Sequence, residues 1–148
     1  MKNFLACART FFAIRKQPLS IDLAILLLRV VVGLAFVLHG WGKIQHPLAW
    51  MGPDSPVPAF FQFLAAFSEF FGGLALISGL LVRLAGMGIL CTMAVAVSLH
   101  AFAMHAPFVA AGPGPSFELP AAYFLIALLF ITTGPGRVSL DRLCFGKK

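Results

Sequence analysis

Charged residues are scarce in this chain of 148 residues, which contains 11 lysines and arginines and only 5 aspartates and glutamates. Hydrophobic residues make up 60% of it, and the mean hydropathy is +0.95. Soluble domains have about a quarter of their residues charged, so this composition excludes a soluble protein. It indicates an integral membrane protein, and the length allows one membrane domain (residues 1–148) with no separate soluble domain.

Cysteine is equally scarce, and its three positions argue against disulfide chemistry. Cys7 and Cys144 flank the apolar part of the sequence, Cys91 lies inside it, and no C-x-x-C pair occurs. A disulfide-forming quinone reductase needs paired cysteines on the outer side of the membrane. Haem, flavin and nucleotide motifs are also missing, because Gly86-Met87-Gly88 lies within an apolar stretch without the strand that a dinucleotide fold requires. We therefore expect no resident cofactor.

The net charge of +6 does not indicate a nucleic-acid-binding protein. The basic residues are divided between the two ends of the chain and form no continuous stripe with interleaved aromatic residues. An anionic membrane leaflet explains them better. The expected partner is the lipid bilayer, and no nucleic acid is expected.

Four apolar stretches predict an all-α fold, an integral membrane four-helix bundle. The predicted spans are residues 21–42, 59–81, 84–104 and 119–133. Segments rich in proline and glycine, 52–58 and 107–115, precede the second and the fourth span and are predicted loops. Residues 134–148 form a tail after the last span.

Residues 1–18 predict an amphipathic helix that lies in the membrane interface. Apolar residues recur there at helical spacing, and Lys2, Arg9 and Lys16 recur every seven residues on the other side. A cleaved signal peptide is the alternative, but a clean apolar run and a small-residue cleavage site are missing.

The distribution of basic residues predicts that both termini are cytoplasmic. Only Lys43 lies near the two loops on the opposite side. The basic residues on the predicted cytoplasmic side are Lys2, Arg9, Arg15, Lys16, Arg83, Arg137, Arg142, Lys147 and Lys148.

Arg29 in the first span and Glu69 in the second are the two charges that must be stabilised within the membrane. Each lies on a stripe of small residues, with Gly33 and Gly40 beside Arg29, and Gly72 beside Glu69. We expect the two stripes to face each other and Arg29 to pair with Glu69. The pair could be a structural pin that holds two helices in register, or it could polarise a ligand in a cavity between them.

Three further residues at the end of the first span extend this candidate ligand site. His39 can change its charge near neutral pH, Lys43 adds an ammonium group, and the indole ring of Trp41 can stack on a ring. A quinone or a small anion would fit such a path from the surface to Glu69. The alternative is that His39 and Lys43 simply lie among lipid headgroups.

Four histidines are predicted near the outer ends of the first and third spans. They could bind copper or zinc, although no close pair of histidines one helical turn apart occurs. Histidines wetted by water at the interface are the commoner situation. The candidate metal ligands are His39, His46, His100 and His105.

Three groups of residues recur in a recognisable order: Arg29, Gly33, Phe36, His39, Gly40 and Lys43, then Glu69, Gly72, Gly73 and Gly79, then Thr133–Arg137 and Ser139–Asp141. Their order and spacing resemble the DoxX family of small bacterial membrane proteins, over roughly residues 21–143. This family is related to the membrane subunit of thiosulfate:quinone oxidoreductase, so the resemblance implies a bacterial inner membrane protein associated with redox chemistry.

Two classes of function are consistent with the sequence. In the first, the chain is the membrane subunit of a redox complex, binds a quinone and works with a soluble redox subunit. In the second, it is a non-catalytic membrane module that docks a partner protein, a lipid or a metal-handling component. The sequence does not indicate whether it self-associates.

Overall fold

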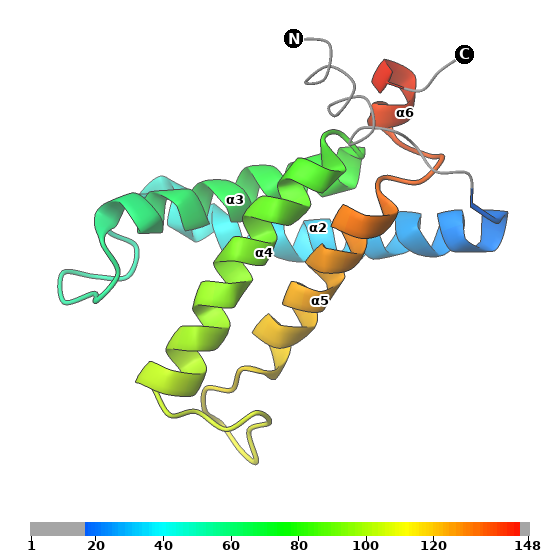
Figure 1. The fold of residues 1–148 in the computed structure, drawn as a ribbon. Helices are drawn as coiled ribbons and strands as arrows, with labels where there is room; N and C mark the ends of the chain where they lie inside the picture. The colour runs from blue at the N-terminus through cyan, green and yellow to red at the C-terminus, as the bar shows by residue number, and fades with distance from the viewer. Residues whose placement is uncertain (1–16, 146–148) are drawn as a thin grey trace, which may run out of the picture.

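The computed structural model describes residues 17–145, and all of the regular structure in this range is helical (Figure 1). The all-α prediction is therefore confirmed, while residues 1–16 of the predicted interfacial segment lie outside the described range. The elements are α2 (Leu19–Gln45), α3 (Ala59–Ser78), α4 (Val82–Ser98), the π-helix η1 (Leu99–Ala103), α5 (Glu118–Thr133) and α6 (Leu140–Phe145).

Three of these helical segments are long and apolar enough to cross a membrane: α2, α3, and α4 together with η1. The fourth, α5, is apolar but has only 16 residues, so it is about 24 Å long. The helices start and end close to the predicted positions. The second span ends at Ser78 rather than at residue 81, because Gly79 adopts a left-handed conformation with φ 71°.

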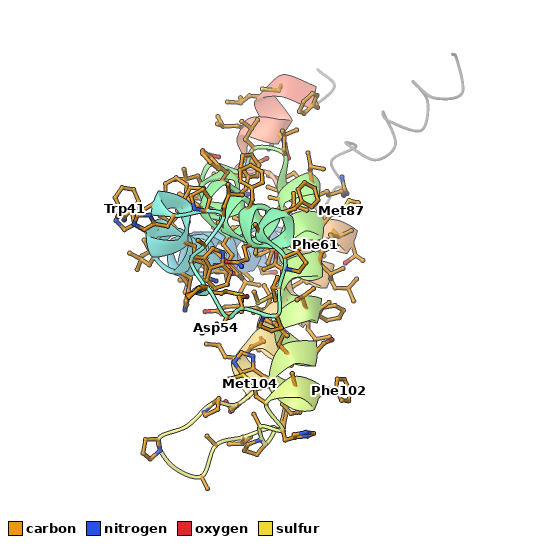
Figure 2. The ribbon with its side chains drawn as sticks, turned by 90° about the vertical axis from the view of Figure 1, so that its left-hand side faces the viewer. Trp41, Asp54, Phe61, Met87, Phe102 and Met104 are labelled. Atoms are coloured by element: carbon orange, nitrogen blue, oxygen red, sulfur yellow. The ribbon has the colours of Figure 1, made fainter. Side chains whose placement is uncertain are left out.

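The four long helices form two antiparallel hairpins. α2 packs along α3, α4 packs along α5, and α3 also contacts α4. In Figure 1 the two hairpins run in different directions and diverge with distance from α6. Figure 2, turned by 90°, likewise shows α4 running away from α2 and α3. We call the end of the molecule at which residues 134–141 meet the start of α2 and the end of α3 the closing end.

The core lies where the two hairpins meet. Its buried residues come from all four long helices, and the ring of Phe36 in α2 also packs against Tyr123 in α5 with 4.9 Å between centroids. The buried cluster comprises Val32, Phe36, Leu76, Val82, Ile89, Met93, Ala127 and Phe130. Most other large apolar side chains on these helices are exposed, as expected for a surface in contact with lipid.

Small residues bring α2 and α3 into backbone contact, as the sequence predicted. A Cβ atom added to Gly33 would lie 2.8 Å from the Gly73 carbonyl oxygen, and one added to Gly73 would lie 2.7 Å from the Gly33 carbonyl oxygen. At Gly40, an added Cβ would lie 2.6 Å from the backbone nitrogen of Phe70. These distances leave no room for a side chain at the helix–helix interface.

We expect Gly73→Ala to destabilise the protein by about 1–3 kcal/mol, because the added methyl group must push two backbones apart. Gly42→Ala is the matched control, since nothing lies within 4 Å of a Cβ added at Gly42 near the end of α2. Thermal unfolding in detergent should show a loss for Gly73→Ala and none for Gly42→Ala. Equal behaviour of the two variants would contradict this account of the interface.

Candidate functional site

The side chain of Arg29 lies at the closing end and binds backbone carbonyl groups. Its Nε donates to the Leu76 oxygen at 2.9 Å, and Nη1 donates to the oxygens of Pro135 and of Val138, the latter at 3.0 Å. The Leu76 carbonyl belongs to the last turn of α3, which favours a positive charge. Gly79 makes room for the guanidinium, because a Cβ atom there would clash with Nη2 of Arg29.

The predicted pair of Arg29 with Glu69 is therefore wrong. Arg29 is 1% exposed and is held by carbonyls, whereas Glu69 forms an ion pair with Lys43. The physical reason is direction, since side chains on a helix lean toward its N-terminus. Arg29 consequently extends toward the start of α2 and reaches Leu76, which is two helical turns beyond Glu69 on α3.

Two aspartates complete the closing end, and sequence reasoning did not predict the partners of either one. The Asp22 carboxylate forms an ion pair with Arg137 (Nε to Oδ2, 2.8 Å) and accepts a hydrogen bond from the Arg137 backbone N–H. The Asp141 carboxylate accepts the backbone N–H groups of Leu81 and Val82, at 2.6 Å and 3.1 Å, and so caps the start of α4. Both aspartates are buried.

Arg83, predicted to lie in a cytoplasmic loop, belongs to the first turn of α4 and is buried. Its Nε donates to the Ile131 carbonyl at 3.0 Å. Gly134 makes room for this side chain, with a φ of 81° and a Cβ position only 2.7 Å from Nη2 of Arg83. Arg83 thus joins α4 to the end of α5, and its role at the closing end is structural.

The second polar site lies at the opposite end of the α2–α3 hairpin. Lys43 Nζ donates to both carboxylate oxygens of Glu69, each at 2.6 Å. The side chain of Glu69 is 3% exposed and that of Lys43 is 24% exposed. A buried carboxylate is therefore neutralised by an ammonium group that still reaches the surface.

The α2–α3 loop, residues 46–57, covers this ion pair with the ring of Trp50. Lys43 Nζ lies 4.4 Å from the centroid of that ring, a cation–π contact. The indole N–H of Trp50 in turn donates to the backbone oxygen of Gln62 in α3 at 2.9 Å. Sequence reasoning missed Gln62, although a glutamine that is 4% exposed in an aromatic-rich apolar helix is an unusual residue.

An open pocket of about 590 Å³ lies between the end of α2 and this loop. Lys43 supplies an ammonium group to its lining, and Trp50 supplies an aromatic ring. The full set of lining residues is Leu38, His39, Gly42, Lys43, His46, Ala49 and Trp50. The structure therefore brings His39, Lys43 and Glu69 to one end of the hairpin, with the pocket against the loop instead of between α2 and α3. Arg29 is not part of it.

The imidazole of His39 is oriented by its own helix. Its Nδ1 lies 2.8 Å from the Ala35 carbonyl oxygen, which can only accept, so Nδ1 donates. In the neutral ring Nε2 is then a hydrogen-bond acceptor. The pocket thus has an acceptor in His39 and a donor in Lys43.

Trp41, predicted to stack against a ligand, does not line this pocket. Its ring packs against Phe70 with 5.7 Å between centroids and is 58% exposed. Figure 2 shows Trp41 pointing away from the body of the molecule, whereas Asp54 marks the α2–α3 loop. The aromatic ring that lines the pocket is that of Trp50, whereas the sequence analysis expected it to be Trp41.

The four histidines are not gathered into one group. His39 and His46 line the pocket, whereas His100 belongs to η1, where its Nδ1 donates to the Ala96 carbonyl at 2.8 Å. His105 follows η1 with a left-handed φ of 50°. Within residues 17–145, no three residues among His, Cys, Asp and Glu are placed to hold a metal ion together.

Comparison with known proteins gives related sequences. A family model described as DoxX matches residues 24–106. The chain is 33% identical over 128 residues to "Inner membrane protein YqjF" of Escherichia coli (strain K12), with 82% of this chain and 92% of that protein covered. It is 28% identical over 133 residues to "Putative oxidoreductase CatD" of Bacillus subtilis (strain 168), with 87% and 93% covered. No solved structure matches significantly.

Proposed function

The chain belongs to the DoxX family, and we propose that it is the quinone-binding membrane subunit of a redox complex in a bacterial inner membrane. The proposal rests above all on one observation: the pocket holds Lys43, His39 and the Trp50 ring together at one end of the α2–α3 hairpin. The name of the relative in Bacillus subtilis, which contains the word oxidoreductase, supports the same class.

A quinone headgroup matches the groups that line this pocket. It is a flat ring with two carbonyl oxygens, for which Lys43 supplies an ammonium donor and Trp50 a stacking surface. Reduction of a quinone takes up two electrons and two protons. His39 and the Lys43–Glu69 pair are the groups that exchange protons with water at the surface, and a separate redox subunit supplies the electrons.

A soluble quinone analogue should quench the fluorescence of Trp50, and Lys43→Met should weaken its binding by about tenfold or more, because a charged hydrogen bond is lost. Titration of a Trp41→Phe variant isolates the signal of Trp50. Trp50→Phe is the control, since its remaining tryptophan, Trp41, lies outside the pocket. Binding that is reported equally by both tryptophans, or that ignores Lys43→Met, would contradict the proposed site.

A second candidate is a non-catalytic membrane module that docks a partner. It is favoured by the fact that the buried charged side chains already have partners within the protein, so none requires a ligand. These residues are Asp22, Arg29, Glu69, Arg83 and Asp141. Absence of quinone binding, together with co-purification of a partner lacking redox activity, would select this alternative.

The proposed orientation places both termini in the cytoplasm. The motivating observation is that the basic residues are concentrated on one side, while Lys43 on the other side is neutralised by Glu69. Reporter fusions at Lys148 and at Gly112 should give opposite compartments. Reporters on the same side would contradict the four-span topology.

A further inference from the structure

Gln62 makes three hydrogen bonds to the α2–α3 loop, and they reach both halves of it. Its backbone oxygen accepts the Trp50 indole N–H at 2.9 Å, and its side-chain Oε1 accepts the Met51 N–H at 3.1 Å. Its Nε2 donates to the Val57 carbonyl at 2.8 Å. The amide of a single buried side chain therefore fixes the beginning and the end of the turn formed by residues 50–57.

The loop is otherwise held by local contacts. Hydrogen bonds within it join Ala49 to His46 and Gly52 to Ala49, and the Ser55 hydroxyl accepts the Val57 N–H at 3.1 Å. Gly52 has a φ of 88° that favours glycine. These contacts shape the loop, but they do not attach it to α3, whereas the Gln62 hydrogen bonds do.

From this geometry we propose that Gln62 is the positioning residue of the pocket. By attaching the loop to α3, it holds the Trp50 ring over the Lys43 ammonium and keeps in place the loop residues that line the pocket opposite α2, Ala49 and Trp50. Loss of the Gln62 side-chain amide removes the bonds to Met51 and Val57 and leaves only the backbone bond to the Trp50 indole, so the loop opens more often, exposes the Lys43–Glu69 pair to water and moves the aromatic surface away from the ligand. The identity of that ligand rests on the proposed function, but the attachment of the loop does not.

The test compares Gln62→Met with Gln45→Met, each in a Trp41→Phe background in which Trp50 is the reporter. Methionine keeps the length of the side chain and its preference for a helix but has no amide. Gln45 is a matched control, because it is exposed near the same pocket and its amide donates to the Trp41 carbonyl in its own helix. Loss of the amide bonds should raise the open-to-closed ratio of the loop by roughly tenfold.

The direct measurement is acrylamide quenching of Trp50 fluorescence without any ligand. Gln62→Met should give a larger quenching constant and a red-shifted emission, and Gln45→Met should match the parent protein. Gln62→Glu keeps the acceptor for Met51 but loses the donor to Val57, so its quenching constant should lie between those of Gln62→Met and the parent protein. If Gln62→Met fails to fold, the same comparison is made with Gln62→Glu. Quenching that is equal in the Gln62 and Gln45 variants overturns the proposal.

A second arm uses the soluble quinone analogue and separates the two proposals. Weaker binding to Gln62→Met than to Gln45→Met supports the positioning role in ligand binding. If the parent protein binds no quinone but Trp50 is still released by Gln62→Met, the proposed function fails and the positioning role stands. If the parent protein binds quinone and Gln62→Met binds equally well with unchanged quenching, the positioning role fails and the proposed function stands.

Discussion

Arg29→Met is expected to lower the free energy of unfolding by about 3 kcal/mol, because it leaves the buried carbonyl of Pro135 and the partly buried carbonyl of Val138 without their donor. Leu76 loses its bond to Arg29 as well, but its carbonyl still accepts the Gly79 N–H. The Arg29 side chain is 1% exposed, so the protein shields this site from water. Thermal unfolding in detergent measures the loss.

Two further variants test whether the loss of stability comes from the hydrogen bonds of Arg29. Arg142→Met removes an exposed arginine whose Nη1 bonds to the Arg137 carbonyl at 3.3 Å, and it should change stability little. Arg29→Lys keeps the charge but lacks the fork that reaches two chain segments, so it should recover only part of the loss. Equal stability of Arg29→Met and Arg142→Met would show that the closing end does not depend on Arg29.

The second large effect on the free energy of unfolding is expected from substitutions in the Lys43–Glu69 pair. Replacing Lys43 should cost more stability than replacing Glu69. Lys43→Met leaves a carboxylate that is 3% exposed without a counterion, at a cost of about 3 kcal/mol. Glu69→Gln leaves an ammonium group that already reaches water, so it should cost less. The double variant Lys43→Met/Glu69→Gln should recover at least about 1 kcal/mol relative to the sum of the single variants.

The matched control for this cycle combines Glu69→Gln with Arg29→Met. These residues share no hydrogen-bond partner in the described part of the chain, so their effects should add to within about 0.5 kcal/mol. The sequence predicted coupling between Arg29 and Glu69, and the structure predicts coupling between Lys43 and Glu69. Additive behaviour of Lys43 and Glu69 would show that their contact contributes nothing to stability.

Hydrophobicity and small-residue spacing were sufficient to predict the helices and the interface between α2 and α3. α3 and α5 end before Gly79 and Gly134, which have positive φ angles, although the apolar run of the second span continues past Gly79 to Leu81. Gly33 in the predicted stripe of α2 faces Gly73 of α3, whereas Gly72, which belonged to the predicted stripe of α3, faces Ile89 in α4. Both features are local or repeat along one helix, so a single sequence contains them.

The partners of the buried charges could not be predicted in the same way. Arg29 binds backbone carbonyls, which every residue possesses and which no sequence pattern marks. The role of Gln62 likewise depends on how residues 50–57 fold back, which requires three-dimensional placement. The ion pair of Asp22 with Arg137 was accessible in principle, because the predicted topology put both at one end of the molecule.

The closing end also dictates the order in which the protein can be completed during synthesis. Arg29 enters the membrane with the first long helix, but its Pro135 partner is 106 residues further along the chain. The carboxylate that caps the N-terminus of α4 likewise belongs to Asp141, which follows Leu81 by 60 residues. A nascent chain that has inserted α2, α3 and α4 therefore still has a guanidinium and a helix start without their final partners. The closing end can form only after residues 134–141 have emerged from the ribosome.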